Sequence, residues 1–306
     1  MDRRMFSLAA ATAVSTVAMC ITRARSRHGR PLGLSSVSTA LAAHPKLAKG
    51  LVAHRGWHYP SDDLTRPLEN TLPAYERAWS AGVPFCECDV TLTKDGEIIL
   101  CHDNDLKRLA LDPSSIIKPV SECNFRDELE YFPLKDGSRV PTLREVLQAA
   151  KRVGRGRQLV IEIKGRDEPC ARRVSELVRT LSDQVALVMG FSVESVVEFA
   201  RSNPKRGSVL SMLLTVRRKG SNNQYFDLNE MEVVVKLIKS NNIDGLYLQF
   251  DKEYLTDDRF IQLCQQIPIG VWGRNVLDPD DLNTVETLLA RGARFVNTDF
   301  PDNFFG

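Results

Sequence analysis

Short apolar runs of strand length recur along this chain, and a stretch of helical length follows most of them. We expect strands at 51–54, 84–91, 158–163, 185–191, 208–214, 244–250, 269–273 and 294–298. We expect helices at 71–81, 142–152, 169–182, 193–202, 229–241, 256–266 and 279–291, the first two with Thr71 and Thr142 as candidate caps. Strands that alternate with helices are typical of parallel βα units, so the sequence predicts an α/β fold.

Two architectures are built from parallel βα units, the closed barrel and the doubly wound open sheet. Ionisable residues stand at the ends of many of the expected strands, which is where a barrel builds its active site. We therefore expect a TIM-type (β/α)8 barrel with a small hairpin excursion after the second strand. Such a barrel takes about 250 residues. A barrel domain at 49–306 and an N-terminal segment at 1–48 then account for all 306 residues.

The N-terminal segment has the composition of a targeting or anchor sequence. Residues 5–22 form an uncharged run rich in Ala, Val, Ser and Thr, with Arg3 and Arg4 before it and more arginines after it. An organelle transit peptide, a secretory or twin-arginine export signal and a membrane anchor all share these features. We expect targeting to a mitochondrion or plastid. Export and membrane association through residues 5–22 are the alternatives.

The charge distribution and the cysteine spacing argue against nucleic-acid binding and against a cysteine-based metal site. The whole chain has a formal net charge of +2, but the residues after 48 carry four more acidic than basic side chains. A net acidic domain is not expected to bind nucleic acid through a basic face. The 7 cysteines include no CxxC pair and no Cys/His metal spacing, so we expect reduced, structural thiols.

A hairpin should follow the second strand. The dipeptide Asp95-Gly96 separates two apolar runs, and the gap is too short for a helical crossover. Residues 97–102 should therefore fold back on strand 84–91. A two-residue turn would place His102 opposite Asp89, on one face with Glu87. The same register would place the thiols on the other face; these are Cys86, Cys88 and Cys101.

Three carboxylates in apolar strands point to a bound cation. Glu87 and Asp89 share one face of a strand that should be buried, and unpaired carboxylates are costly there. Glu162 is a third buried carboxylate, with Lys164 two positions on. An internal Glu162–Lys164 ion pair is the simpler interpretation of that spacing. Beside the other two acids, we expect Glu162 to be a metal ligand and Lys164 a phosphate contact. An all-carboxylate set suits Mg²⁺ or Ca²⁺.

Two histidines complete the candidate chemistry. His54 closes the first strand and His102 the returning arm of the hairpin, and cleavage of a phosphodiester needs both a base and an acid. Arg55 offers a planar fork of donors suited to phosphate. Gly56 permits a sharp turn after the strand. His58 lies in the following loop, and we interpret it as incidental.

These motifs, in this order, resemble the glycerophosphodiester phosphodiesterase family. The matching segments are His54-Arg55-Gly56, Glu69-Asn70-Thr71, Glu87-Cys88-Asp89-Val90, Thr93-Lys94-Asp95-Gly96, His102-Asp103, Pro141-Thr142-Leu143, Glu162-Ile163-Lys164, Val271-Trp272 and Thr298-Asp299-Phe300-Pro301. Each match is short, but together they span residues 51–303 in family order. Departures such as Leu68 before Glu69 lie in rim loops and leave the identity of the substrate open.

The resemblance implies a metal-dependent hydrolysis of glycerophosphodiesters to glycerol 3-phosphate and an alcohol. It also implies that Glu69 joins the metal site and that Asn70 and Trp272 bind substrate, with Arg55 and Lys164 on the phosphate. The expected partner is a small glycerophosphodiester or lysophospholipid, with no nucleic acid.

Two other functions are weighed against this one. A lysophospholipase D-type or phosphatidylglycerol-directed activity on membrane lipids is kept open by the N-terminal segment and by the aromatic loop 57–59. A catalytically inactive binding protein that keeps a structural metal is the rival from another class. Such a protein usually lacks a histidine or a ligand, and none of the candidates is missing here.

Overall fold

The computed structural model describes residues 47–58, 66–115, 118–217, 219, 223–273 and 280–305. Most of the N-terminal segment 1–48, with residues 5–22, lies outside this part, as do Cys20 and Tyr59. No helix within the described ranges is long and apolar enough to span a membrane.

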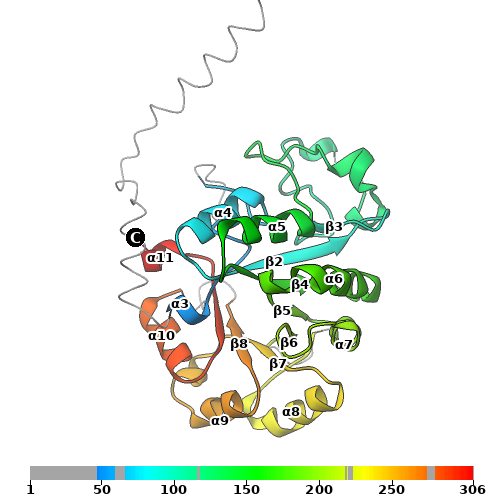
Figure 1. Cartoon of the computed structure of the whole chain (residues 1–306). Coiled ribbons are helices and arrows are strands. Elements are labelled where there is room, and N and C mark those ends of the chain that lie inside the picture. The colour runs from blue at the N-terminus through cyan, green and yellow to red at the C-terminus, as the bar shows by residue number, and fades with distance from the viewer. Residues whose placement is uncertain are drawn as a thin grey trace, which may run out of the picture. The chain divides into compact units, whose positions relative to one another are not determined.

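Eight parallel strands close into a barrel, which confirms the TIM-type fold and excludes the open sheet (Figure 1). The parallel strands are β1 (Leu51–Ala53), β2 (Phe85–Leu92), β4 (Gln158–Ile163), β5 (Val185–Gly190), β6 (Leu210–Thr215), β7 (Gly245–Gln249), β8 (Ile269–Trp272) and β9 (Phe295–Thr298). Strand β1 pairs with β9 on one side and with β2 on the other, so the sheet has no free edge between them. Each strand coincides closely with one of the predicted apolar runs.

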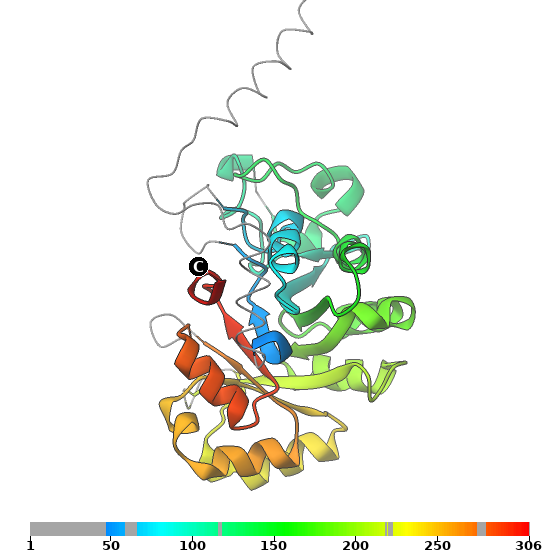
Figure 2. The ribbon, with the colours of Figure 1, turned by 60° about the vertical axis from the view of Figure 1, so that its left-hand side comes forward.

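Helices pack around the outside of the barrel (Figure 2). They are α3 (Leu47–Gly50), α4 (Leu72–Ser80), α5 (Leu143–Val153), α6 (Glu168–Leu181), α7 (Val193–Ser202), α8 (Met231–Ser240), α9 (Asp258–Gln266), α10 (Leu282–Ala290) and α11 (Asp302–Phe305). Short helical turns lie at η4 (Ser182–Gln184), η5 (Leu228–Glu230) and η6 (Lys252–Leu255). Every predicted helical stretch coincides with one of the helices α4 to α10.

The two predicted threonine caps behave differently. Thr142 forms a capping box with Glu145 at the start of α5, which satisfies two backbone N–H groups. Thr71 occupies the cap position of α4, but its hydroxyl donates to the carbonyl of Leu68 instead. The position of Thr71 was therefore predicted correctly, and its hydrogen bond was not.

The hairpin after β2 has a longer turn than predicted. Strand β3 (Ile98–Leu100) pairs Val90 with Leu100 and Leu92 with Ile98. The Thr93 N–H donates to the carbonyl of Glu97 over 2.9 Å, so three residues form the loop rather than two. Gly96 adopts a φ of 83°, which fits the left-handed position of a three-residue loop. The register is therefore shifted by one residue, and the expectation that His102 pairs with Asp89 is wrong.

Cys101 takes the place opposite Asp89, to whose carbonyl its N–H donates over 3.1 Å. The expectation that Cys101 shares a face with Cys86 and Cys88 is wrong as well. Cys101 packs in a small separate core formed by 99–140, whereas Cys86 and Cys88 pack between the strands and the helices. The segment that builds this small core also forms the short helical turns η1 (Pro113–Ser115), η2 (Val120–Glu122) and η3 (Phe125–Leu129), of which η2 and η3 bury side chains in it. The six described cysteines are all free thiols, as expected.

Helix α3 ties the start of the described chain to the barrel. Leu47 is 1% exposed and belongs to the main core. It lies two residues before the predicted domain start at Lys49. The domain boundary stays a prediction, but the barrel's own packing includes Leu47.

Candidate active site

A cavity of about 510 Å³ opens at the carboxyl ends of the barrel strands. Most of the predicted site residues line it, and they come from strands far apart in the sequence. The polar residues that line it are His54, Arg55, His58, Glu69, Glu87, His102, Arg108, Glu162, Lys164, Asn223, Asn297 and Asp299. The position agrees with the general location of active sites in TIM-type barrels.

Three of the predicted metal ligands converge at one end of this cavity. Glu87 and Asp89 project from β2, and Glu162 lies beside Asp89 on the adjacent strand β4. One oxygen from each carboxylate lies within 4.8 Å of the others. Glu87 Oε1 is buried and has no hydrogen-bond partner within the described chain, and Asp89 Oδ1 is buried with only the Lys164 ammonium beside it. An orphaned buried oxygen such as Glu87 Oε1 is costly without a ligand, so this donor set fits a hard divalent cation.

The pKa shifts of the three acids also fit a cation site. Burial and the neighbouring Asp89 carboxylate raise the pKa of Glu87, and burial raises the pKa of Glu162. Burial would also raise the pKa of Asp89, but Arg55 and Lys164 outweigh it and hold that pKa well below its ordinary value. A cation among the three would favour the charged form of all of them.

Lys164 follows β4 and contacts two of these acids. Its Nζ lies 2.7 Å from Glu162 Oε1 and 3.2 Å from Asp89 Oδ1. The ion pair weighed as the simpler interpretation of the sequence therefore forms. This ion pair does not exclude a role for Lys164 in binding phosphate, since Lys164 also lines the cavity. Its contact with a phosphate stays a prediction.

Arg55 is held in a strained backbone conformation beside the three acids. Its φ is 54°, and its N–H donates to Glu87 Oε2 over 2.9 Å. Its guanidinium lies 3.0 Å from Glu69 Oε1 and 3.1 Å from Asp89 Oδ2. A non-glycine residue at positive φ persists where the surrounding structure enforces it. Gly56 follows at a φ of 82°, where a Cβ would lie 2.9 Å from the backbone of Ala74.

Asn70 lies behind Asp89 rather than in the cavity lining. It also has positive φ, 56°, and its N–H donates to the carbonyl of Arg55 over 3.1 Å. Its amide Nδ2 donates to Asp89 Oδ2 over 2.9 Å. Its Oδ1 accepts from the Asp89 N–H and from the hydroxyl of Tyr75. In this position Asn70 fixes the orientation of Asp89, and its predicted contact with substrate stays untested.

Glu69 is engaged by two arginines. Its carboxylate accepts from both terminal nitrogens of Arg108, over 2.8 and 2.7 Å, and from Arg55. It is not one of the three carboxylates that converge. Its predicted role as a fourth metal ligand stays a prediction.

His54 follows β1 and pairs with a residue from the end of the chain. Its Nδ1 hydrogen-bonds the carboxylate of Asp299, and its Nε2 lies 3.8 Å from Glu87 Oε2. Burial alone would lower the pKa of His54, but Asp299 raises it to about 9. Asp299 belongs to the family-like motif Thr298-Asp299-Phe300-Pro301, from which no role for it was predicted. The structure shows that Asp299 orients His54 and stabilises its charged form.

His102 reaches the same cavity from the other side of the acids. Its Nδ1 lies 2.7 Å from Asp103 Oδ1, and Asp103 Oδ2 accepts from Arg108 Nε over 2.7 Å. The chain bends away from β2 after the Cys101 N–H has bonded the Asp89 carbonyl, and this bend brings His102 into the lining despite the shifted register. Both histidines thus have one ring nitrogen bonded to a carboxylate, which leaves the other nitrogen for proton transfer.

The model of one family matches nearly the whole described barrel. The Glycerophosphoryl diester phosphodiesterase family matches residues 54–303. This chain belongs to that family. The match includes both histidines and all three converging acids, and it confirms the resemblance drawn from the motifs.

Relatives of this phosphodiesterase family member support the fold. Human lysophospholipase D GDPD1 is 26% identical over 179 residues, which cover 55% of this chain and 52% of that protein. The chain therefore spans about half the length of that relative. A glycerophosphodiester phosphodiesterase from Parabacteroides distasonis aligns with a TM-score of 0.61 at 24% identity, covering 83% of this chain and 94% of that one. An Oleispira antarctica phosphodiesterase, solved with its product sn-glycerol-3-phosphate, aligns with a TM-score of 0.61 at 19% identity, covering 83% and 94%.

The wall of the cavity that faces away from the three carboxylates is apolar. Trp272, at the end of β8, packs edge-on against Phe191 with ring centres 5.7 Å apart. Its Nε1 donates to the carbonyl of Thr215 over 3.2 Å, which fixes the indole. The wall is completed by Met189, Leu214 and Val216. Trp272 therefore lines the cavity, and its predicted contact with substrate stays a prediction.

Sequence reasoning missed or dismissed two further cavity residues. His58, interpreted as incidental, is 3% exposed and has its ring centre 6.4 Å from that of His54. Burial lowers the pKa of His58. Arg108 received no role, although it bridges Glu69 and Asp103 at the cavity rim. Nothing in the local sequence around Arg108 indicates those two partners.

Proposed function

We propose that this protein hydrolyses glycerophosphodiesters to glycerol 3-phosphate and an alcohol, with the help of a divalent cation. The observation that carries the proposal is the convergence of three buried carboxylates, one of them with an orphaned oxygen, at a cavity that two carboxylate-bound histidines also line. Glu87, Asp89 and Glu162 would hold the cation, and Mg²⁺ or Ca²⁺ suits their oxygens. When bound, such a cation stabilises the charge that develops on a phosphate oxygen.

The chain's own residues supply the rest of the proposed mechanism. Lys164 and Arg55 stand beside the carboxylates as cations that would orient the phosphate. His54 and His102 exchange protons with the attacking and leaving oxygens, one as base and the other as acid. Asp299 and Asp103 hold the two imidazoles in place through Nδ1, which directs each Nε2 toward the reacting groups.

The relatives support the class of substrate. The Oleispira antarctica structure contains sn-glycerol-3-phosphate, the product that this reaction would release. We extend that chemistry to this chain because the family model covers the site residues.

A second candidate substrate class is a lysophospholipid, as for a lysophospholipase D. The apolar wall of Trp272, Phe191 and Leu214 favours it, because such a wall could accept an acyl chain. The name of the human relative agrees with this alternative, but it favours it no more strongly than the other comparisons favour glycerophosphodiesters.

One panel of substrates tests both candidate substrate classes, glycerophosphodiesters and lysophospholipids. The purified protein is incubated with Mg²⁺ or Ca²⁺ and glycerophosphocholine, glycerophosphoethanolamine or lysophosphatidylcholine, and the released alcohol is measured. We expect the soluble diesters to be cleaved faster. No release from any diester, by a protein that binds the cation, would refute the proposed function. Glu162→Gln is the matched inactive control, because it removes one ligand charge at nearly constant volume.

We also propose that residues 1–48 direct the protein to a mitochondrion or plastid. Their composition supports this proposal: they contain seven basic side chains and a single acid, Asp2. A fluorescent protein fused after residue 48 should accumulate in the organelle. Secretion of the fusion, or its uniform cytosolic distribution, would refute the proposal.

A further inference from the structure

The end of the barrel opposite the cavity is strongly basic. The loops that lead into the parallel strands meet there, because all eight strands run in the same direction. Apart from Arg291, which pairs with Asp258 of α9, their exposed or half-buried basic side chains are Lys49, Arg155, Arg157, Lys205, Arg206 and Arg294. The acidic side chains of the same loops are Asp183 and Asp244, and Asp244 is held by Ser211. We call this surface the amino-end face.

The six basic residues named for the amino-end face form no ion pair with the described part of the chain, although Arg206 hydrogen-bonds Asn242 and Arg294 lies over the Phe295 ring. Arginines on the outer helices, such as Arg172 and Arg173, form ion pairs with nearby glutamates. By contrast, Lys49, Arg155 and Lys205 form no ion pair within the described ranges. A set of like charges that repel one another without internal compensation is typical of a surface that meets an anionic partner. Lys151 and Arg152 in the last turn of α5 extend it.

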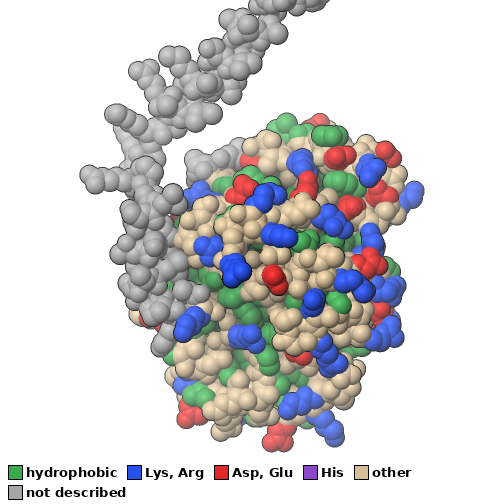
Figure 3. Space-filling view, in the orientation of Figure 1, with side chains coloured by type: hydrophobic (Ala, Val, Ile, Leu, Met, Phe, Trp, Pro, Cys, Tyr) green, Lys and Arg blue, Asp and Glu red, His purple; other side chains and the backbone are tan. Residues whose placement is uncertain are grey.

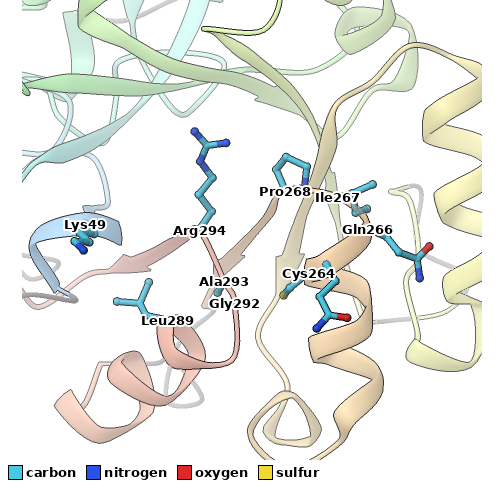
Figure 4. A pocket seen from close by; sticks show the side chains of 10 residues that line it. Lys49, Cys264, Gln266, Ile267, Pro268, Leu289, Gly292, Ala293 and Arg294 are labelled. Atoms are coloured by element: carbon cyan, nitrogen blue, oxygen red, sulfur yellow. The ribbon is translucent and has the colours of Figure 1, made fainter.

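An apolar hollow lies on the same face. A cavity of about 570 Å³ is bounded by the ends of helices α9 and α10 and by the starts of strands β8 and β9 (Figure 4). Leu289, Ile267 and Pro268 give it apolar walls, and Lys49 and Arg294 stand at it as cations. Figure 3 shows one face of the molecule, in the orientation of Figure 1. On it, Lys and Arg side chains lie around a central area with apolar side chains and few acidic ones.

The chain enters the barrel at this face. Helix α3 leads directly into β1, so the segment before Leu47 joins the amino-end face and not the rim of the active-site cavity. That segment includes the uncharged run 5–22 and six arginines. Stable binding to a membrane generally requires two weak signals, such as an apolar segment and a polybasic surface. The amino-end face itself supplies both kinds of signal, through its cations and its apolar hollow.

We propose that the amino-end face docks on an anionic lipid surface. A nucleic acid would also complement the charge, but it would leave the apolar hollow without a role. The basic N-terminal segment itself would be repelled by the face, so it is not the occupant. In the docked state the active-site cavity opens on the side away from the bilayer, toward water.

Vesicle binding of the full chain tests the docking. Vesicles of phosphatidylcholine alone are compared with vesicles that also contain phosphatidylserine, by co-sedimentation at low and high salt. Each basic side chain near an anionic surface contributes about 1 kcal/mol, or about fivefold in the partition coefficient. The triple variant Arg155→Glu, Lys205→Glu, Arg294→Glu should therefore bind phosphatidylserine vesicles about 100-fold more weakly. High salt should weaken wild-type binding as well, because it screens exposed charges.

A matched variant controls for net charge. Lys94→Glu, Arg126→Glu and Lys252→Glu change the charge of the chain equally at exposed positions outside the amino-end face. The control should bind like the wild type, and neither triple variant should change the cleavage of soluble substrate. Equal binding of the wild type to both kinds of vesicle would overturn the proposal, as would equal losses in the two variants. Tighter binding to duplex DNA than to the vesicles, lost in the Arg155, Lys205 and Arg294 variant, would assign the face to nucleic acid instead.

Discussion

Replacing Asp299 with Asn should reveal which role His54 plays. The Asp299 carboxylate holds the protonated imidazole, and it raises the pKa of His54 from 6.5 to about 9 against the effect of burial. Asn keeps the size of the side chain but removes the charge, so the pKa should fall by two units or more. At pH 8 the protonated fraction of His54 should then drop from about nine tenths to a few per cent.

The pH profile of kcat/KM is the assay. If His54 is the general acid, the alkaline limb of the profile should move about two units toward neutrality in Asp299→Asn. If His54 is the base, the acidic limb should move by a similar amount in the same direction. Asp302→Asn is the matched control, because Asp302 pairs with Arg66 and not with His54. A profile with both limbs unmoved, in a folded and metal-loaded variant, would refute the role given to the pair.

The same substitution should lower stability in a defined pH window. The folded pKa of His54 lies above its unfolded value, so its contribution is full below pH 6.5 and disappears as pH rises through about 9. Burial would raise the pKa of Asp299, but His54 lowers it to about 2, so its contribution disappears as pH falls through that value. The pKa shifts of His54 and Asp299 describe the same ion pair. It contributes on the order of 3 kcal/mol to the free energy of unfolding between about pH 4 and 6.5. Urea unfolding should show that loss at pH 6 and little difference above pH 10.

Four further outcomes are expected. Chelation should abolish activity, and Glu162→Gln should weaken Mg²⁺ binding in calorimetry; full turnover without metal would contradict the ligand set. His102→Ala should lower kcat about 100-fold without unfolding the protein, as circular dichroism would show. Gly96→Val should destabilise the hairpin by about 1–2 kcal/mol in urea, because its φ is positive although a Cβ there meets nothing within 4 Å. A chain that starts at Lys49 should melt below one that also keeps the buried Leu47, whereas equal melting temperatures would contradict the packing of α3.

The barrel and the three acids could be predicted because their signals are local and periodic. Glu87, Asp89 and Glu162 stand in apolar runs whose alternation fixes their faces before any tertiary contact is known. The hairpin turn could not be settled in this way, since Gly96 at positive φ suits both a two-residue and a three-residue loop. The hydroxyl of Thr93 decides between them, because it accepts from the Glu97 N–H and closes the longer loop.

The carboxylate partners of the two histidines could not be predicted from the local sequence. Asp299 meets His54 across 245 positions of sequence, a contact that exists only because the last barrel strand closes against the first. Arg108 depends in a similar way on the fold of the segment after β3. That segment builds a small core of its own around Ile99 and Leu106, which positions Arg108 between Asp103 and Glu69.

The two ends of the barrel bear on the choice between substrates. The charges of the domain are separated in space: acidic side chains converge at the cavity, and cations without an ion pair in the described ranges lie at the amino-end face. A protein docked through its cations would turn the cavity away from the lipid, so a lysophospholipid would have to leave the bilayer to be cleaved. A soluble glycerophosphodiester needs no such step. Docking through the amino-end face therefore predicts that vesicle binding leaves the cleavage of glycerophosphocholine unchanged, and that lysophosphatidylcholine in the same vesicles is protected.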